Sequence, residues 1–510
     1  MSLANANRLR GEPTAISRIV TAIRTRDLST GAWPKLAALV GAALAVRLFG
    51  LGRQGLWFDE AYSIFVAKLP LAFSMNVLIS DGVHPPLYYL IQRIALLLGE
   101  GEAAVRLPAM LFGLLAVPLM FLLGNLWAGE RTGLIAAALI VLSPFHIWYS
   151  QEARMYSALM TLSILCMFAY TRLLQPGRHR GIEAVFVLAS GLAYLTHYFA
   201  LFLPLVQFAH IAVNFKRQHG LLARWLVLQL LAAIPLLLWL YLIYQQPQVI
   251  VGIGWIEVPR PMDLWYTLVN FSIGFVEQSD VLRAVGAILF GGLAILGART
   301  RWRLDFVASL VVLWALLPLV LTFLISLKRP MYVDRFLILS LPAFVLLVAK
   351  GLDSMRRQAR LAAGSAVLLL LMYGVVTFTF GTAQQKEDWR GAAKYLSRAA
   401  ADEALVVRTL QMVIPLAYYH ADYESFQVIE VNRIIKPISQ YAEGHKGTWL
   451  LYWSPASDAH SVAATETLDI GDEADPQIAG WMAGQGPEIL ERVDFRGLTI
   501  FHFNDFASEF

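Results

Sequence analysis

Long apolar stretches, separated by short polar segments, fill most of the first 380 residues of the chain. A membrane span needs about 20 mostly apolar residues when it is helical, and eleven stretches approach or reach that length. They cover residues 33–51, 106–127, 132–149, 155–174, 182–197, 199–214, 222–244, 280–298, 305–327, 335–350 and 361–380. The pattern predicts an α-helical polytopic membrane protein that crosses the bilayer about eleven times.

One apolar segment, DGVHPPLYYLIQRIALLLG at residues 81–99, is predicted not to span. Its apolar part has about fourteen residues, a length that favours an interfacial or re-entrant helix. Keeping it outside the membrane leaves the basic loops on the same side as the basic N-terminus, in agreement with the positive-inside rule. We therefore predict a cytoplasmic N-terminal segment at residues 1–32 and a long first outer loop at residues 52–105.

The composition changes after residue 384, where charged and polar residues become common. The helix-like stretch DWRGAAKYLSRAAADE is followed by the strand-like stretches ALVVRTL, GTWLLYW and LTIFHF. Alternation of this kind is typical of an α/β fold. We expect a transmembrane domain at residues 33–384 and a small extracytoplasmic α/β domain at residues 385–510, because an odd number of spans carries the chain to the outer side.

Composition excludes a water-soluble fold. The chain is 58% hydrophobic and only 15% charged, whereas a soluble domain has about 25% charged residues. The net charge of +5 falls in short clusters between apolar stretches, so it indicates topology rather than a surface for nucleic acid. The single cysteine, Cys166, allows no disulfide within the chain.

The first candidate for chemistry is GLWFDEAYS at residues 55–63, just outside the first predicted span. Asp59 and Glu60 are adjacent acids in a loop with few other charges. A partly desolvated carboxylate at this position can act as a general base toward a hydroxyl group. The alternative is a solvated helix N-terminus, where acids interact favourably with the helix dipole.

The second candidate surrounds the two prolines of the non-spanning segment. These prolines are expected to start a helix whose free amide groups attract anions. His84, directly before them, can add a hydrogen bond or a charge to a phosphate. The alternative is an interfacial histidine beside an aromatic belt.

The third candidate is SPFHIWYSQEARMYS at residues 143–157, where Glu152, Arg154 and Tyr156 lie at the outer end of a predicted span. Ionisable groups at that depth are costly unless they are paired or functional. Residues two apart on a helix do not face each other, so Glu152 and Arg154 are expected to have different partners.

The fourth candidate is RPMYVDRFLILSLPAF at residues 329–344, which contains Tyr332 and Arg335. Positive charge is disfavoured on the outer side, so these residues, together with Arg106, indicate an anion to be bound. Snorkelling to lipid phosphates is the alternative for each cation. Two residues are left open: His197 lines a pocket or is structural, and Arg47 snorkels or faces a pocket.

Taken in order, these motifs resemble the GT-C glycosyltransferases that use polyprenyl-phosphate sugars, such as protein O-mannosyltransferases and the aminoarabinose transferase of lipid A. The likeness rests on WFDEAYS, HPPLYYLIQRIALLLGEGEAAVRLPAMLFGLLAVPL and LSPFHIWYSQEARMYSALM. It covers residues 55–175, is weaker at 329–344 and is only general at KEDWRGAAKYL, residues 386–396. The chain looks most similar to the bacterial branch that contains the rhizobial galacturonosyltransferases.

The resemblance implies a GT-C fold with juxtamembrane helices and gives roles to individual residues. Asp59 becomes the general base, and Glu60 supports it or contacts the acceptor. A lysine of relatives is replaced by His84, which leaves phosphate neutralisation more dependent on the arginines. The residues expected to bind substrate are His84, Arg106, Glu152, Arg154, Tyr156, Tyr332 and Arg335.

The implied reaction is an inverting transfer of a hexose or pentose from a polyprenyl-phosphate-linked sugar to a hydroxyl of a cell-envelope acceptor. The acceptor is a glycolipid, for example of lipopolysaccharide, a polysaccharide or a protein. Some superfamily members need a divalent cation, and Glu152 is one residue that would help to hold it. The implied location is the bacterial inner membrane, with the active site and the C-terminal domain in the periplasm.

Two other functions fit parts of the pattern. A transporter or flippase of lipid-linked substrates agrees with the many spans, but transporters place ionisable and helix-breaking sites near the bilayer midplane. Here such residues gather at the outer ends of the predicted spans. A scaffold that binds envelope proteins through the C-terminal domain is the third hypothesis.

Overall fold

The computed structural model describes residues 29–175, 180–246, 256–275, 279–304, 306–381, 386–397, 404–407, 412–419, 427–430, 447–453, 461–462 and 489–504. Most of the predicted N-terminal segment at residues 1–32 lies outside these ranges. The chain forms two compact units. The helical unit contains Met1–Phe49, Pro70–Ala95 and Arg106–Gly381, and the α/β unit contains Gly50–Leu69, Leu96–Val105 and Thr382–Phe510.

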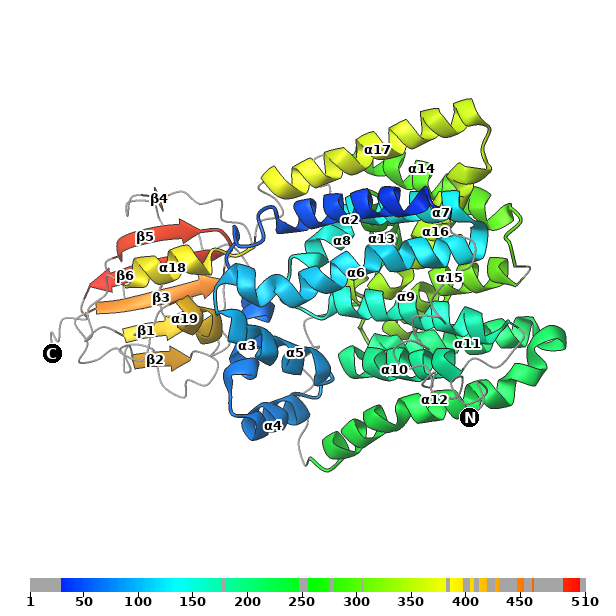
Figure 1. The fold of residues 1–510 in the computed structure, drawn as a ribbon. Coiled ribbons are helices and arrows are strands. Elements are labelled where there is room, and N and C mark those ends of the chain that lie inside the picture. The colour runs from blue at the N-terminus through cyan, green and yellow to red at the C-terminus, as the bar shows by residue number, and fades with distance from the viewer. Residues whose placement is uncertain are drawn as a thin grey trace, which may run out of the picture. The chain divides into compact units, whose positions relative to one another are not determined.

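Helices of very different length build the helical unit (Figure 1). In chain order they are α2 (Ala32–Leu48), α4 (Leu71–Asp81), α5 (Leu87–Ala95), α6 (Glu102–Ala128), α7 (Glu130–Leu142), α8 (Pro144–Ser150), α9 (Tyr156–Leu173), α10 (Arg180–Thr196), η3 (Tyr198–Leu201), α11 (Phe202–Val213), α12 (Phe215–Tyr244), α13 (Pro261–Ile273), α14 (Asp280–Arg299), α15 (Val307–Ser326), η4 (Asp334–Ser340), α16 (Leu341–Ser354) and α17 (Arg357–Phe380). Every stretch that the sequence predicts to span is one of these helices or a consecutive pair of them.

The number of spans needs a correction. Among the described residues, seven helices are long and apolar enough to cross a membrane, or eight if the bent pair α7 and α8 counts as one span. The other three predicted spans are α2, α10, and η3 with α11. A helix of 17 residues, the length of α2 and of α10, rises about 25 Å, which is less than the hydrocarbon thickness of about 30 Å.

The predicted span at residues 132–149 is not straight, because α7 and α8 meet at a bend of 62°. Pro144 has no N–H group, so the carbonyl of Ile140 loses its donor within the helix. Arg47 replaces that donor: its guanidinium donates to the carbonyl oxygens of Ile140 at 3.0 Å and Val141 at 3.4 Å. Since Arg47 is fully buried, it neither snorkels to lipid nor faces a pocket.

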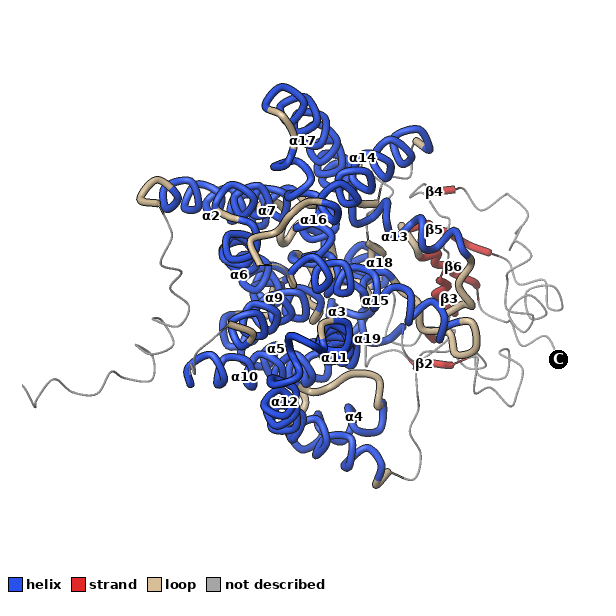
Figure 2. The backbone as a smooth tube through the Cα atoms, turned by 90° about the vertical axis from the view of Figure 1, so that its right-hand side faces the viewer, coloured by secondary structure: helices blue, strands red, loops and turns tan. Residues whose placement is uncertain are grey.

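Small residues allow close helix packing in this unit, as they do in many membrane proteins. α14 lies against α16 (Figure 2). A Cβ atom added at Gly297 would collide with the carbonyl oxygen of Leu347, and one at Gly351 would collide with that of Leu293. Larger residues at these two glycines would push α14 and α16 apart.

The segment predicted not to span forms α5, which begins directly after Pro86, and a 3-10 turn at Leu96–Leu98. Together they contain twelve residues at Leu87–Leu98, too few to cross a bilayer. This agrees with the prediction that the segment at residues 81–99 does not span the membrane.

The α/β unit has a six-stranded sheet in the order β2-β1-β3-β6-β5-β4. β1 runs parallel to β2 and β3, and the other neighbours are antiparallel. The elements are α3 (Phe58–Lys68), α18 (Trp389–Leu396), β1 (Ala404–Val407), α19 (Val413–Tyr419), β2 (Gln427–Glu430), β3 (Gly447–Trp453), β4 (Ser461–Val462), β5 (Ile489–Phe495) and β6 (Leu498–Asn504). Within the described residues, the helix predicted after residue 384 is α18, and the three predicted strands are β1, β3 and β6. The sequence did not predict α19, β2, β4 or β5.

Apolar side chains of α18 and α19 form one core with those of β1, β3 and β6. Trp389, Leu405, Leu416, Leu451 and Ile500 are almost completely buried in it. α3, from the first outer loop, packs on α19. The residues that carry the first candidate motif therefore belong to the same compact unit as the C-terminal strands.

Candidate functional site

Asp59 and Glu60 lie in the first turn of α3. The chain enters this helix from Trp57, whose extended conformation ends the preceding loop, and the backbone N–H of Ala61 donates to the carbonyl of Trp57. Carboxylates interact favourably with the free amide groups of a helix N-terminus. Asp59 is partly exposed, whereas Glu60 is fully buried.

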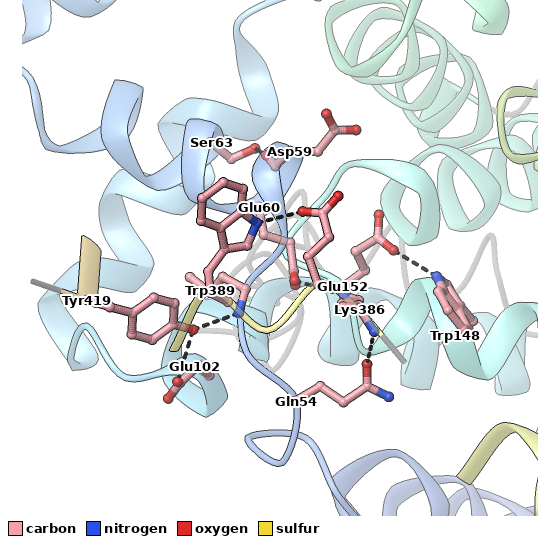
Figure 3. A network of polar contacts seen from close by, with 12 residues as sticks. Gln54, Asp59, Glu60, Ser63, Glu102, Trp148, Glu152, Lys386, Trp389 and Tyr419 are labelled. Carbon is pink, nitrogen blue, oxygen red and sulfur yellow. Dashed lines mark hydrogen bonds and ion pairs between the residues drawn. The ribbon is translucent and has the colours of Figure 1, made fainter. Parts of the chain in front are cut away.

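Glu60 forms an ion pair with Lys386, with an Oε2 to Nζ distance of 2.8 Å (Figure 3). The side chain of Lys386 is 9% exposed and that of Glu60 is 0% exposed. The backbone N–H of Lys386 also donates to the side chain of Gln54 at 3.0 Å. For Glu60, burial in an ion pair excludes the alternative of a solvated helix terminus.

Further contacts within the α/β unit fix the segment that precedes α3. The Tyr419 hydroxyl accepts from the backbone N–H of Leu56 at 2.7 Å and donates to Glu102 at 3.1 Å (Figure 3). Burial raises the pKa of Tyr419, so its hydroxyl keeps the proton that it donates. Arg390 pairs with the same Glu102 at 2.6 Å. Residues from α18 and α19 thus determine where α3 begins.

A second group of polar residues lies in the helical unit and consists of His84, Arg154, His197 and Arg335, which we call the His–Arg cluster. Nη2 of Arg154 donates to Nε2 of His84 at 3.3 Å. The rings of His84 and His197 lie edge to face, with their centroids 5.8 Å apart. Electrostatic effects of Arg154 and Arg335 reach both imidazoles.

Both histidines of the cluster are neutral at physiological pH. Burial lowers the pKa of His84 well below 6.5, and Arg154, His197 and Arg335 add to this effect. Burial, followed by Arg154 and Arg335, lowers the pKa of His197 to about 3. The cluster therefore presents two guanidinium charges and two uncharged imidazoles.

Glu152 and Arg154 have different partners, as their spacing predicts. Glu152 is buried and accepts a hydrogen bond from Nε1 of Trp148 at 2.8 Å (Figure 3), whereas Arg154 donates to His84. Tyr156, at the start of α9, stacks on Phe336 with ring centroids 6.2 Å apart. The loop between α8 and α9 thus supplies both Glu152 and Arg154.

The remaining predicted site residues lie in α6 and next to η4. The guanidinium of Arg106 is buried in α6. The Tyr332 hydroxyl bonds to Thr267 of α13 at 2.8 Å, and Asn270 of the same helix donates to Asp334 at 2.7 Å. α13 therefore holds the segment that leads to Arg335.

Comparison with known proteins gives a match at both the family and the fold level. Residues 83–241 match the family described as dolichyl-phosphate-mannose-protein mannosyltransferase. ArnT from Cupriavidus metallidurans bound to undecaprenyl phosphate has the same fold, with a TM-score of 0.61 and 14% identity over 94% of this chain and 99% of ArnT. The chain has the GT-C fold.

Two further solved structures share the GT-C fold. ArnT in the apo state gives a TM-score of 0.59 and 14% identity over 93% of this chain and 98% of that chain. The Archaeoglobus fulgidus oligosaccharyltransferase in complex with Zn and sulfate gives 0.52 and 14% identity over 82% of this chain and 67% of that chain. No curated protein matches the sequence. The resemblance to the GT-C superfamily is confirmed, and the narrower likeness to the galacturonosyltransferase branch stays a prediction.

The sequence alone did not identify Lys386 as a member of the first group or His197 as a member of the second. Lys386 was not among the predicted site residues, although KEDWRGAAKYL already showed a general likeness to the superfamily. His197 was left open between pocket and structure, and it lies next to His84. Among the described residues, no group of three or more His, Cys, Asp or Glu is placed to hold a metal ion.

Proposed function

We propose that this GT-C protein is an inverting glycosyltransferase that moves a sugar from a polyprenyl-phosphate donor to a hydroxyl of a cell-envelope acceptor. The observation that carries the proposal is the His–Arg cluster, a buried group of cations and hydrogen-bond donors suited to a phosphate. ArnT, which shares the fold, has been solved with undecaprenyl phosphate bound. A lipid phosphate is therefore the ligand that the cluster fits best.

In the proposed reaction Asp59 takes the proton from the acceptor hydroxyl. The acceptor oxygen then attacks the anomeric carbon from the face opposite the phosphate, and the bond between that carbon and the phosphate oxygen breaks. The electron pair of this bond leaves with the lipid phosphate, so the anomeric configuration inverts. Arg154 and Arg335 stabilise the negative charge that builds up on the phosphate.

Glu60 acts as a positioning residue in this proposal. Its carboxylate is buried and bound by Lys386, so it fixes the first turn of α3, which also carries Asp59. Glu152 and Tyr156 are proposed to line the substrate beside Arg154, and Arg106 and Tyr332 to complete the binding site.

The proposed setting is the outer face of the bacterial inner membrane, with Asp59 and the C-terminal domain in the periplasm. The charge distribution supports this orientation, because the basic loops fall on the side of the N-terminus. The proposed acceptors are a glycolipid, a polysaccharide or a protein of the envelope, and mass spectrometry of envelope glycans from cells with and without the protein would identify sugar and acceptor together.

Replacing Asp59 with Asn tests the proposed base. We expect Asp59→Asn to reduce sugar transfer by at least about 100-fold, the usual loss when a general base is removed. Binding of undecaprenyl phosphate should be unchanged, because the charges of the His–Arg cluster are untouched. The measurement is transfer of radiolabelled sugar from a polyprenyl-phosphate donor by the purified full-length protein.

Asp388→Asn is the matched control, because Asp388 is exposed and also begins a helix, where asparagine is an equally good N-cap. It should keep full activity. Full activity of Asp59→Asn would contradict the assignment of the base. Movement of the lipid across the membrane without any sugar transfer would instead favour the flippase alternative.

A further inference from the structure

The hydrogen bonds of the His–Arg cluster fix the proton on each imidazole. An arginine side chain only donates, so Nε2 of His84, which lies 3.3 Å from Nη2 of Arg154, must be the acceptor. Nδ1 of His197 accepts from the backbone N–H of Phe199 at 3.1 Å. In a neutral imidazole the other nitrogen carries the proton. His84 therefore presents an Nδ1–H donor and His197 an Nε2–H donor.

The surrounding groups also disfavour a positive charge on either ring. The charges of Arg154 and Arg335 act on both imidazoles. Two acids lie in the same region. Asp334 accepts from Asn270 at 2.7 Å and from the backbone N–H of Arg335 at 2.6 Å, and Glu152 accepts from Trp148 at 2.8 Å. The groups whose charges act on the two imidazoles are nevertheless the arginines. The other titratable groups nearby are Tyr149, Tyr156 and Asp81, which is close to Tyr198.

We infer that the His–Arg cluster is a site selective for a phosphate monoester dianion, in which Arg154 and Arg335 supply the charge and His84 and His197 act as neutral N–H donors. This inference rests on the proposed function and deepens it. The sugar donor is a phosphodiester with one negative charge, whereas the departing lipid phosphate is a monoester with two. Two fixed guanidinium charges attract the second more strongly.

The consequence for catalysis is that binding strengthens as the reaction proceeds. When the bond to the anomeric carbon breaks, the phosphate gains one negative charge, and the proton removed from the acceptor stays on Asp59. Interactions that are stronger with the departing phosphate than with the donor lower the barrier. Neutral histidines donate hydrogen bonds to the phosphate but add no positive charge. Added positive charge would strengthen binding of the sugar donor as well as binding of the departing phosphate.

The test measures binding of two lipids to the full-length protein in nanodiscs between pH 5 and pH 8. One lipid is undecaprenyl phosphate, a monoester whose second ionisation has a pKa of about 6. The other is its methyl ester, a diester that keeps one charge throughout. We expect the affinity for the monoester to rise about ten-fold across this range and the affinity for the methyl ester to stay constant.

Cationic histidines would instead make the affinity for the monoester fall as the pH rises, because they lose their charge. An affinity that falls with rising pH, or equal affinities for the two lipids at pH 8, would therefore overturn the inference and leave a lipid-phosphate donor intact. If neither lipid binds at any pH, the proposed donor fails and the inference fails with it. The two failures are thus distinguishable.

Amide variants test the neutral donors directly. Asn at position 84 places an N–H near Nδ1, and Gln at position 197 places one near Nε2, so His84→Asn and His197→Gln should keep the pH profile and most of the affinity. His84→Leu and His197→Leu remove the donors and should lose about ten-fold in affinity for the monoester. Thermal melting identifies any variant that fails to fold, and the comparison of the two lipids on the unsubstituted protein does not depend on these variants.

Discussion

Glu60 is a fully buried acid whose charge is matched by Lys386 at 2.8 Å. A buried ion pair adds little net stability compared with an apolar pair, but removal of one partner leaves an uncompensated charge in a medium of low dielectric constant. Both partners are therefore needed to place the first turn of α3 correctly. Asp59 lies in the same turn, so the ion pair also fixes the position of Asp59.

Lys386→Met should lower the free energy of unfolding of the α/β unit by about 3–5 kcal/mol, because Glu60 remains charged and buried. Sugar transfer should fall as well. The double variant Glu60→Gln/Lys386→Met should recover most of the stability, and Lys394→Met, at an exposed position of α18, is the control. A single variant as stable as the unsubstituted protein in thermal melting would contradict this prediction.

His197 makes the stability of the helical unit depend on pH. Its pKa is about 3 in the folded protein and 6.5 ordinarily. A lowered pKa gives stability that is present above pH 6.5 and is lost as the pH falls toward the folded value. The loss should be about 2 kcal/mol at pH 5, and burial of His84 should act in the same direction.

The measurement is the melting temperature between pH 7 and pH 5 without added lipid. The melting temperature should fall over this range, and His197→Gln should reduce the fall, since glutamine does not titrate. A fall of equal size in His197→Gln would show that other groups are responsible.

At the scale of elements, the bend between α7 and α8 determines where the loop with Glu152 and Arg154 begins. Pro144 causes the bend and leaves the carbonyl of Ile140 without its helical donor. Arg47 donates to this carbonyl and to that of Val141. Gln151, which follows α8, also binds the end of α2: its side chain donates to the backbone carbonyls of Arg47 at 2.9 Å and Phe49 at 2.8 Å. The end of α2 and the bend therefore stabilise each other.

Arg47→Met should destabilise the protein by about 2 kcal/mol, because two buried carbonyl groups lose their donors. Pro144→Ala in the same chain should recover part of this loss, since alanine supplies an N–H to Ile140. Melting temperatures of the two single variants and the double variant form the test. Additive effects of the two substitutions would show that Arg47 does not serve the carbonyls at the bend.

At the scale of the whole molecule, the chain combines a bundle of membrane helices with an α/β unit that takes residues from both the first outer loop and the C-terminus. Such a unit forms only when the two segments lie on the same side of the membrane. The charge distribution along the chain led to the prediction that this side is the outer one. The orientation is therefore open to a direct test.

Cysteine labelling in intact cells tests the orientation, because the natural Cys166 is buried and gives a low background. Ser397→Cys and Ser354→Cys are conservative changes at exposed positions after α18 and at the end of α16. A maleimide that does not cross membranes should label Ser397→Cys in intact cells and Ser354→Cys only after permeabilisation. The reverse pattern would place the proposed active site in the cytoplasm.

The sequence by itself determined most of the long helices, the class of fold and three strands of the C-terminal domain, β1, β3 and β6. Long apolar stretches must be helical in a bilayer, where the backbone finds no other hydrogen-bond partners. A short apolar and aromatic run such as GTWLLYW, bounded by a glycine, is typical of a buried strand. The prolines before α5 predicted its start for the same local reason. The motif WFDEAYS and the prolines also predicted the superfamily.

Only the tertiary structure decided which polar residues meet. Lys386 lies 326 residues from Glu60, and His197 is separated from His84 by several helices, so no spacing rule connects them. The bend at Pro144 divides the predicted span at residues 132–149 into two helices. The role of Arg47 was ambiguous, because a lone arginine near the end of a span has the same sequence pattern whether it snorkels or binds carbonyls. Long-range electrostatics depend on burial and distance, which arise when helices pack and are not encoded in any local pattern.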